Sequence, residues 1–462
     1  MSVFNFKISN DKNIVNNYNK IQFGEVITPF SLIDKIINLL PSEVFSNPKL
    51  TWLDPCVGSG NFMIFLYKKL FKSLQTEIKE PEKRHYHIIT KMLEMIEINP
   101  EYSSLLKSIF GENSNIKIAN FLELDNKKNQ KKYDIIIGNP PFNSGGSIKV
   151  PTNNKLSKKT DGKSIWTDFI INSINILNDN GYIAMITPSI WMKRDHKMFN
   201  FIRANGKILK LHTLTNTETN TIFNKQAQTP TSFWLFQKNS NKKNQINEVN
   251  IWDKINNKYV LFNENLSIPL KYPSIISKLL QYTQEYGHIL VTKTNMPSTK
   301  RDFEIKDTLT DMHKYKNIRS CVLNKLKPEL VVNYSNKPCC FYEKEKLVLA
   351  HKMYGFPYYD EKGEYGISNR DNYVIVGYTK KEFERLKQFL SLNLSLLVFE
   401  TTRYRMKYLE RYAFEFMPDI TKIPDFPDVI TDNTVSDYFN FTQQERLAIK
   451  NITKKEYFIS FN

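Results

Sequence analysis

The stretch YDIIIGNPPF, residues 133–142, decides the fold that we expect for this chain. Its three consecutive isoleucines, residues 135–137, end at a turn signal, which is typical of a parallel strand buried on both faces. Pro140 and Pro141 then restrict the backbone and remove two N–H donors, so neither a sheet nor an ordinary helix can continue. The stretch therefore predicts a rigid turn at the carboxyl end of a buried strand.

The groups at this turn suit the binding of a planar amine. Asn139 supplies an amide, Pro140 a carbonyl and Phe142 an aromatic ring, at the strand edge where open α/β sheets bind ligands. Two acceptors can hold an amino group while its ring system stacks on the aromatic side chain. A Pro-Pro turn that merely ends a strand is the alternative, and this motif alone does not separate the two interpretations.

The composition indicates a folded protein with a polyanionic partner. A chain of 462 residues can form two or three domains, and 41% hydrophobic with 13% aromatic residues can fill their cores. The formal net charge of +18 favours nucleic acid, because Lys and Arg neutralise phosphates. The coding bias of an AT-rich genome, which enriches Lys, Asn and Ile, is an alternative explanation for this charge.

The cysteines and the hydropathy pattern indicate the compartment. Cys56, Cys321, Cys339 and Cys340 show neither metal-ligand spacing nor a disulfide framework, which predicts a reducing environment and no metal site. No signal peptide is found, and no apolar run approaches the roughly 20 residues that span a bilayer. We expect an intracellular, cytoplasmic protein without a membrane partner, in a bacterial cell or in a host cell if the source is viral.

Strands that alternate with helices predict a doubly wound α/β sheet over residues 21–240. The preceding residues 1–20 are polar and are expected to form a flexible arm. At the other end of this region, residues 222–224 and 231–236 are expected to close the sheet as an antiparallel hairpin.

A second domain is expected after the periodicity stops in residues 237–248. Residues 249–462 are aromatic and basic, with less regular alternation, and a helix is predicted from Lys380 to Leu397. Within residues 400–416, cations interleave with tyrosines, which suits contacts to phosphates and bases. A solvated helix face whose tyrosines pack inward is the alternative. The four cations are Arg403, Arg405, Lys407 and Arg411.

Residues 50–70 predict a second ligand site, at the end of the first strand. Gly58 and Gly60 allow close approach of the backbone to a ligand, and the helix N-terminus behind them favours a carboxylate or phosphate. Asp54 suits a cationic group, so the combination fits an amino acid headgroup. The spacing DPxxGSG matches neither the dinucleotide fingerprint nor the P-loop.

Other polar and aromatic residues at expected element ends extend this site. Glu97 ends the second strand and can accept from a ribose diol, although a solvated carboxylate is equally compatible. Asn120 and Phe121 end the third strand, where an amide can read an adenine edge and a ring can lie against its face. Thr28 begins a helix, and a plain N-cap would explain it. Residues 143–164 are expected to form either a lid or a surface loop.

Together these motifs resemble the gamma-type N6-adenine DNA methyltransferase family, which uses S-adenosylmethionine. The order of the motifs along residues 21–238 carries the resemblance. In chain order they are GEVITP (24–29), DPCVGSGNF (54–62), IEINP (96–100), NFLEL (120–124), NPPF (139–142) and IFNKQAQTPTSFWLFQK (222–238). The resemblance implies a Rossmann-like methyltransferase sheet over residues 21–240 and an α+β target-recognition domain over residues 249–462.

The resemblance also assigns roles to individual residues. Asn139, Pro140, Pro141 and Phe142 would form the catalytic motif, and Phe142 and Phe223 would contact the flipped target base. Asn120 stands where the family usually has an aspartate. The residues that would hold S-adenosylmethionine are Thr28, Asp54, Pro55, Gly58, Gly60, Glu97, Ile98, Asn120 and Phe121.

The main prediction is therefore a site-specific DNA adenine-N6 methyltransferase of the restriction–modification type, acting on duplex DNA as a monomer. No nuclease motif is found in the chain, so a cognate restriction endonuclease would be a separate partner. Two alternatives stay open. NPPF also occurs in RNA adenine methyltransferases, and NPPY occurs in enzymes that methylate glutamine amides of proteins. A catalytically silent nucleic-acid-binding subunit is the other alternative.

Overall fold

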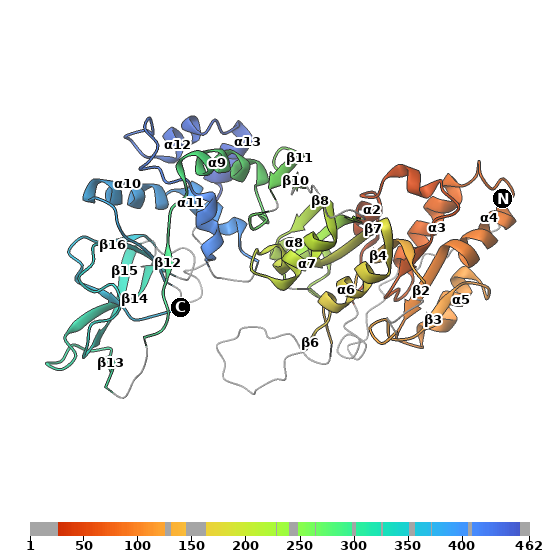
Figure 1. Cartoon of the computed structure of the whole chain (residues 1–462), viewed down its shortest axis with the longest axis horizontal. Helices are drawn as coiled ribbons and strands as arrows, with labels where there is room; N and C mark the ends of the chain where they lie inside the picture. The colour runs from red at the N-terminus through yellow and green to blue at the C-terminus, as the bar shows by residue number, and fades with distance from the viewer. Residues whose placement is uncertain are drawn as a thin grey trace. The chain divides into compact units, whose positions relative to one another are not determined.

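The structure is a computed structural model of the whole chain, and it forms two compact units, Met1–Ile251 and Trp252–Asn462 (Figure 1). The division falls within strand β10 (Glu248–Asp253), shortly after the predicted boundary segment. The residues that the structure describes are 26–124, 131–144, 163–227, 229–239, 248–263, 265–297, 302–324, 327–350, 356–370, 372–404 and 409–452.

A nine-stranded sheet organises residues 52–263, in the order β11-β10-β8-β9-β7-β4-β1-β2-β3. Strands β1, β2, β3, β4 and β7 pair in parallel, and β9 runs antiparallel to both β7 and β8. The order reverses between β1 and β4, which creates a switch point. This confirms the predicted Rossmann-like methyltransferase sheet. The strands are β1 (Trp52–Asp54), β2 (Leu93–Glu97), β3 (Ile116–Ile118), β4 (Tyr133–Gly138), β7 (Leu177–Pro188), β8 (Gly206–Leu214), β9 (Thr231–Lys238), β10 and β11 (Lys258–Asn263).

Several helices of this unit bury apolar residues in its hydrophobic core. These residues recur at helical spacing and therefore form one apolar face on the helix. In α2, Leu32, Ile33, Ile36 and Ile37 are all buried, and each such side chain stabilises the fold by about 1.5–3 kcal/mol. They join the helix α3 and the strands β1 and β4 in one hydrophobic core. The helical elements of this unit are α2 (Phe30–Ile37), η1 (Ser42–Phe45), α3 (Asn61–Ser73), α4 (Pro81–His87), η2 (Ile88–Met92), α5 (Tyr102–Phe110), α6 (Trp166–Ile176), η3 (Ser189–Met192), α7 (Lys197–Asn205) and α8 (Asn216–Ile222).

The predicted hairpin between residues 222–224 and 231–236 is wrong. Residues 216–222 form helix α8, which begins with a reciprocal cap. The backbone N–H of Glu218 donates to the Thr215 hydroxyl at 3.2 Å, and the Thr215 N–H donates to the Glu218 carboxylate at 2.7 Å. This cap satisfies the first helical donors, so the segment folds as a helix. Strand β9 instead pairs with β7 and β8.

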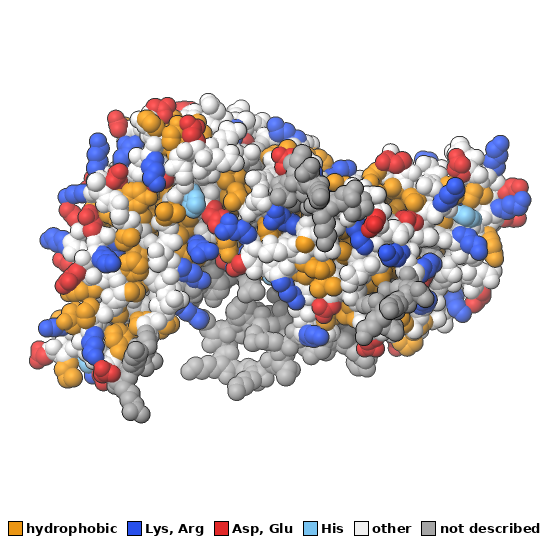
Figure 2. Space-filling model, in the orientation of Figure 1, with side chains coloured by type: hydrophobic (Ala, Val, Ile, Leu, Met, Phe, Trp, Pro, Cys, Tyr) orange, Lys and Arg blue, Asp and Glu red, His pale blue; other side chains and the backbone are white. Residues whose placement is uncertain are grey.

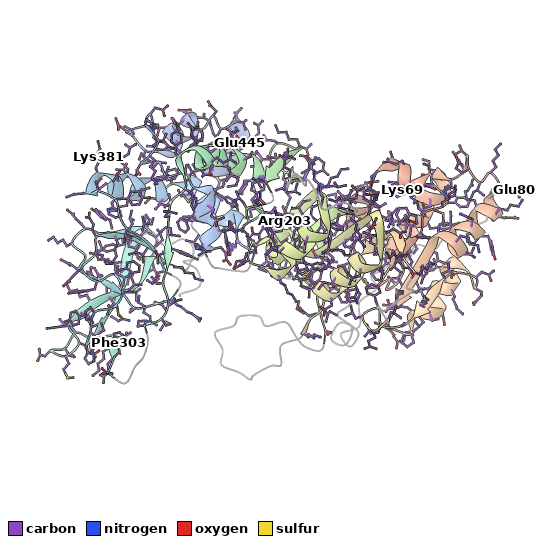
Figure 3. The ribbon with its side chains drawn as sticks, in the orientation of Figure 1. Lys69, Glu80, Arg203, Phe303, Lys381 and Glu445 are labelled. Carbon is purple, nitrogen blue, oxygen red and sulfur yellow. The ribbon has the colours of Figure 1, made fainter. Side chains whose placement is uncertain are left out.

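The second unit has the predicted α+β character, with two four-stranded sheets ordered β12-β19-β16-β17 and β13-β15-β14-β18. An ion pair joins two of its helices, since Nζ of the half-buried Lys278 in α9 lies 2.6 Å from the buried carboxylate of Glu445 in α13. Figure 3 labels Glu445. Its elements are α9 (Pro273–Tyr286), β12 (Thr292–Lys293), β13 (Ile305–Lys306), β14 (Tyr315–Asn324), β15 (Lys327–Ser335), β16 (Lys346–Leu349), β17 (Tyr358–Asp360), β18 (Gly366–Ile367), β19 (Tyr373–Ile375), α10 (Lys380–Leu390), α11 (Asn393–Thr401), η4 (Arg411–Phe416), α12 (Asp432–Tyr438) and α13 (Gln443–Lys450).

The single helix predicted from Lys380 to Leu397 is broken in two. Helix α10 ends at Leu390, and α11 begins at Asn393. The carboxylate of Asp432 accepts from the backbone N–H groups of Asn393 at 3.2 Å and Leu394 at 3.0 Å. A distant side chain thus caps the second helix at its N-terminus. Across the described ranges, no helix is both long and apolar enough to cross a membrane.

Candidate active site

The NPPF turn follows β4 at the carboxyl edge of the sheet, beside the switch point. The side-chain NH₂ of Asn139 donates to the Thr28 hydroxyl at 3.0 Å and to the Val26 carbonyl at 3.4 Å. The other end of this amide, Oδ1, is buried and accepts no hydrogen bond from any described residue. A buried acceptor without a donor costs about 1–3 kcal/mol, so the turn holds an acceptor suited to a ligand.

The remaining residues of the turn also lie at this edge of the sheet. Pro140 is buried, and Pro141 and Phe142 are half-buried. Phe142 packs against the core of the unit, and its carbonyl accepts from the Ile165 N–H at 3.2 Å. Directly after it, the short strands β5 (Asn143–Ser144) and β6 (Lys163–Ser164) pair antiparallel. The rest of the predicted lid, residues 145–162, lies outside the described residues.

The glycine loop before α3 joins the ends of β1 and β2. The Gly58 N–H donates to the Glu97 carboxylate at 2.7 Å, and the other Glu97 oxygen accepts from the Asn99 N–H at 2.8 Å. Glu97 is only 6% exposed, so a solvated carboxylate is the wrong interpretation. A carboxylate has about four lone-pair positions, which leaves capacity for ligand hydroxyls.

The two glycines of this loop are required for different reasons. Gly58 has a φ of +54°, and a Cβ at this position would meet no described heavy atom within 4 Å. Gly60 has a φ of +89°, and its Cβ would lie 3.0 Å from Leu106 Cδ2. Gly60 thus lets α3 approach α5, while Gly58 borders open space at the start of α3. No described side chain caps the N-terminus of α3.

Asp54 connects the glycine loop with the end of strand β4. Its carboxylate is 1% exposed and accepts from the Cys56 N–H at 3.0 Å, while Pro55 beside it is buried. Burial, together with the nearby charge of Glu97, raises the pKa of Asp54 to about 7. Gly138 has a φ of +150°, and a Cβ there would lie 2.8 Å from Asp54 Oδ1. A glycine at this position therefore allows β4 to end against the Asp54 carboxylate.

Cys56 belongs to this cluster although sequence reasoning gave it no role. Desolvation and the Asp54 carboxylate raise the pKa of its thiol well above the usual value, while the Asn139 backbone N–H lowers it. A protonated thiol is a poor nucleophile, so Cys56 is not suited to covalent chemistry here, and its contact with the Asn139 N–H links the two motifs. The sequence could have indicated this, because Cys56 lies between Asp54 and Gly58 in the motif DPCVGSG.

Two of the residues predicted to hold the cofactor, Ile98 and Phe121, have different environments. Ile98 is 43% exposed directly after β2, so its apolar surface is accessible to a ligand. Phe121 is 4% exposed, and its ring stacks on that of Phe169 with centroids 5.4 Å apart. The contact of Phe121 with adenine stays a prediction.

Asn120 lies in a turn and not at a strand end as predicted, because β3 already ends at Ile118, while the sequence predicts a third strand over residues 117–124. Its Oδ1 accepts from the Leu122 N–H at 3.1 Å, and its NH₂ donates to Glu123 at 2.8 Å. The side chain thus stabilises its own turn, and its contact with the cofactor also stays a prediction.

Phe223, the predicted second contact to the target base, is 2% exposed and belongs to the hydrophobic core. It follows α8 directly and precedes Asn224 and Lys225, whose φ values are +46° and +64°. Phe142, in contrast, is half-buried and partly accessible at the edge of that core. The structure thus provides one partly accessible ring and one enclosed ring, and the role of Phe223 stays a prediction.

The predicted nucleic-acid-binding segment in the second unit is partly engaged in internal contacts. Arg403 pairs with Glu400 at 2.9 Å, and Lys271 pairs with the other Glu400 oxygen at 3.2 Å. Tyr404 is completely buried and donates to a backbone carbonyl, and Tyr412 is 6% exposed. These two tyrosines therefore pack inward, as the alternative to a nucleic-acid-binding segment predicts.

The other cations of this segment are less constrained or not described. The Arg411 guanidinium lies 5.5 Å from the centroid of the Tyr412 ring. Arg405 and Lys407 lie outside the described residues. On the face seen in Figure 2, Lys and Arg side chains are spread among Asp and Glu over both units. DNA binding by the four predicted cations stays a prediction.

A doubly wound sheet, a glycine loop with a strand-end acid, and a turn that presents an amide oxygen lie together in this unit, which has the Rossmann-like methyltransferase fold. Comparison with known sequences agrees, because residues 28–223 match the family described as Eco57I restriction-modification methylase. The predicted resemblance to the N6-adenine methyltransferases is therefore confirmed for this part of the chain.

Four curated relatives match in sequence, including the following two. An uncharacterized adenine-specific methylase of Mycoplasma pneumoniae is 25% identical over 254 residues, covering 39% of this chain and 58% of that protein. The type II methyltransferase M.VspI of Vibrio sp. (strain 343) is 30% identical over 169 residues, covering 35% and 36%. The chain thus spans less than two thirds of the length of either relative.

Solved structures show more distant similarity. The M protein of the type I restriction enzyme EcoKI has a TM-score of 0.38 and 20% identity, covering 50% of this chain and 48% of that chain. The type IIL restriction-modification enzyme MmeI, in complex with DNA, has a TM-score of 0.46 and 14% identity, covering 87% and 69%. Likeness at these scores does not bear on the function.

Proposed function

We propose that this chain is a site-specific DNA adenine-N6 methyltransferase of the restriction–modification type that uses S-adenosylmethionine. The observation that carries the proposal is the buried Oδ1 of Asn139, which accepts from no described residue and belongs to the NPPF turn. The family match over residues 28–223 supports the same chemistry.

The turn suits activation of an adenine amino group by hydrogen bonding. The nitrogen is a poor nucleophile because its lone pair is delocalised into the ring. When Asn139 Oδ1 and the Pro140 carbonyl accept its two protons, a pyramidal nitrogen with a localised lone pair is favoured. Catalysis is then positioning and electrostatic stabilisation, without a metal or a covalent nucleophile. Stacking on Phe142 offsets the few kcal/mol needed to extrude the base from the duplex.

The loop between β1 and α3 fits S-adenosylmethionine, which when bound supplies an electrophilic sulfonium methyl group. Open space at Gly58 and the uncapped N-terminus of α3 suit the carboxylate of the methionine part. Asp54 suits the ammonium group, whose charge would favour the ionised form of this buried acid. Glu97 and the exposed Ile98 suit the ribose and the adenine.

Duplex DNA is the proposed substrate because the relatives are named an adenine-specific methylase and a type II methyltransferase. The net charge of +18 agrees with a polyanionic substrate. We further propose that the enzyme is monomeric and intracellular, and that its cognate restriction endonuclease is a separate protein.

The test is transfer of a labelled methyl group from S-adenosylmethionine to unmethylated AT-rich genomic DNA, with bulk RNA in parallel. Asn139→Ala should abolish transfer while cofactor binding persists. Asn250→Ala is the matched control, because Asn250 is also half-buried and donates to a backbone carbonyl, but it lies in β10 and not in the NPPF turn. Label on RNA alone would move the substrate to RNA. Absence of transfer to either, with cofactor bound, would favour a silent binding subunit.

A further inference from the structure

We propose that Thr28 is a positioning residue, whose hydroxyl orients the Asn139 amide so that Oδ1 is presented to the target amine. Thr28 accepts from the Asn139 NH₂ at 3.0 Å across 111 residues of sequence. The inference rests on the proposed function for the identity of the amine. It differs from the predicted role of Thr28 in cofactor binding.

The chemistry of the neighbours determines which end of the Asn139 amide faces them. The Val26 carbonyl, 3.4 Å from the amide nitrogen, can only accept a hydrogen bond. With the amide turned around, Oδ1 would face that carbonyl oxygen, and the two acceptors would repel each other. The nitrogen therefore belongs on the side of Val26 and Thr28, which leaves Oδ1 on the opposite side.

Thr28 is itself held rigidly. It is 5% exposed, and its β-branched side chain has few rotamers. Pro29 follows it, restricts its backbone to extended conformations and starts α2 by accepting from the N–H groups of Leu32 and Ile33. The N-cap residue of this helix is Pro29, and no described side chain caps it, so the plain N-cap interpretation of Thr28 is wrong. A rigid hydroxyl is suited to fix a neighbouring amide.

A second contact with the cofactor remains chemically open to Thr28. A hydroxyl has one donor and two acceptor positions, and Asn139 uses one of the acceptors. The two roles predict different kinetics. A cofactor ligand changes the affinity for S-adenosylmethionine, whereas a positioning residue changes the rate of transfer once the cofactor is saturating.

The experiment compares Thr28→Val, which keeps the shape but removes the acceptor, with Thr28→Ser, which keeps the acceptor. We expect Thr28→Val to lower the single-turnover rate at saturating S-adenosylmethionine by about 10-fold. Its cofactor Kd, measured by calorimetry, should stay within about twofold, because the Thr28 hydroxyl acts on Asn139 and not on the cofactor. Thr28→Ser should behave like the wild type. An unchanged rate, or weaker cofactor binding with an unchanged saturated rate, would overturn the inference.

A second readout does not depend on activity. The full chain is labelled with ¹⁵N-asparagine, and the side-chain NH₂ signals of Asn139 are assigned by their loss in Asn139→Asp. These signals should shift in Thr28→Val and stay in place in Thr28→Ser. Signals unchanged in Thr28→Val would overturn the inference. A wild type that transfers no methyl group would instead contradict only the proposed function.

Discussion

The turn at residues 139–142 and the segment at residues 400–416 differ in whether their polar groups have partners among the described residues. In the first unit, Asn139 Oδ1 is buried beside the switch point and accepts from no described residue. In the second unit, Arg403 pairs with Glu400, and Tyr404 donates to a backbone carbonyl. The first arrangement leaves a hydrogen-bonding position to a ligand, whereas the second stabilises the unit itself.

The difference separates a buried acceptor that lacks a donor from a basic residue that has a suitable spacing in the sequence. A buried acceptor without a donor lowers the stability of the ligand-free fold, and at Asn139 this acceptor lies at the sheet edge where open α/β sheets bind ligands. An arginine at a suitable spacing carries no such signal, because a buried carboxylate such as Glu400, which is 5% exposed, needs a partner for structural reasons. The following predictions test whether the contrast holds.

The largest effects are expected at the two phenylalanines assigned to the target base. Phe223→Ala should lower the free energy of unfolding by about 3–5 kcal/mol, because this ring is 2% exposed in the core.

Phe142→Ala should lower the free energy of unfolding less but slow single-turnover transfer by about 10- to 100-fold, since stacking on a base contributes about 1–3 kcal/mol. Denaturant unfolding and labelled-methyl transfer measure the two quantities. A Phe223→Ala protein that is stable but slow would show that Phe223 acts on the base.

The pH dependence of stability should reveal the buried acid at the site. The pKa of Asp54 is about 7 in the folded chain, against a usual value of 3.8. Between these values the folded state binds more protons than the unfolded state, so stability falls as the pH rises. From pH 5 to pH 8 this group should contribute a loss of about 2–3 kcal/mol.

Asp54→Asn is the comparison for that measurement, because its amide oxygen can still accept from the Cys56 N–H. The difference in unfolding free energy between wild type and variant should change with pH in the stated direction. Saturating S-adenosylmethionine should reduce the change, since its ammonium group favours the ionised acid. A difference that is the same at both pH values would contradict the burial of an ionisable Asp54.

The smallest effects are expected at the cations of the second unit. Arg411→Ala should weaken DNA binding modestly and lower the slope of log affinity against log salt by about 1, as loss of one phosphate contact does. Arg403→Ala should leave that slope unchanged and lower stability by about 1 kcal/mol, because its guanidinium pairs with Glu400. Equal salt slopes for both variants would remove the contrast between the two segments.

Much of the fold could be predicted because local patterns specify it. The isoleucine run predicted β4, and the glycines at 58 and 60 predicted the loop before α3. The capping box of Thr215 and Glu218 was also visible in the sequence, yet the aromatic pattern around Phe223 was interpreted as a hairpin. The break before α11 could not be predicted in this way, since the capping carboxylate of Asp432 comes 39 residues later.

By itself, the sequence determined the alternation of strands and helices, the rigid turn at Pro140 and Pro141, and the motif order that identifies the methyltransferase unit. The first two are properties of short segments, since backbone restriction and side-chain periodicity act over a few residues. The motif order can be read directly from the chain. The tertiary structure alone decided which way the Asn139 amide faces, why Asp54 is a weak acid, and that Arg403 is paired. Each of these depends on groups from distant segments, because hydrogen bonds and burial are set by neighbours in space.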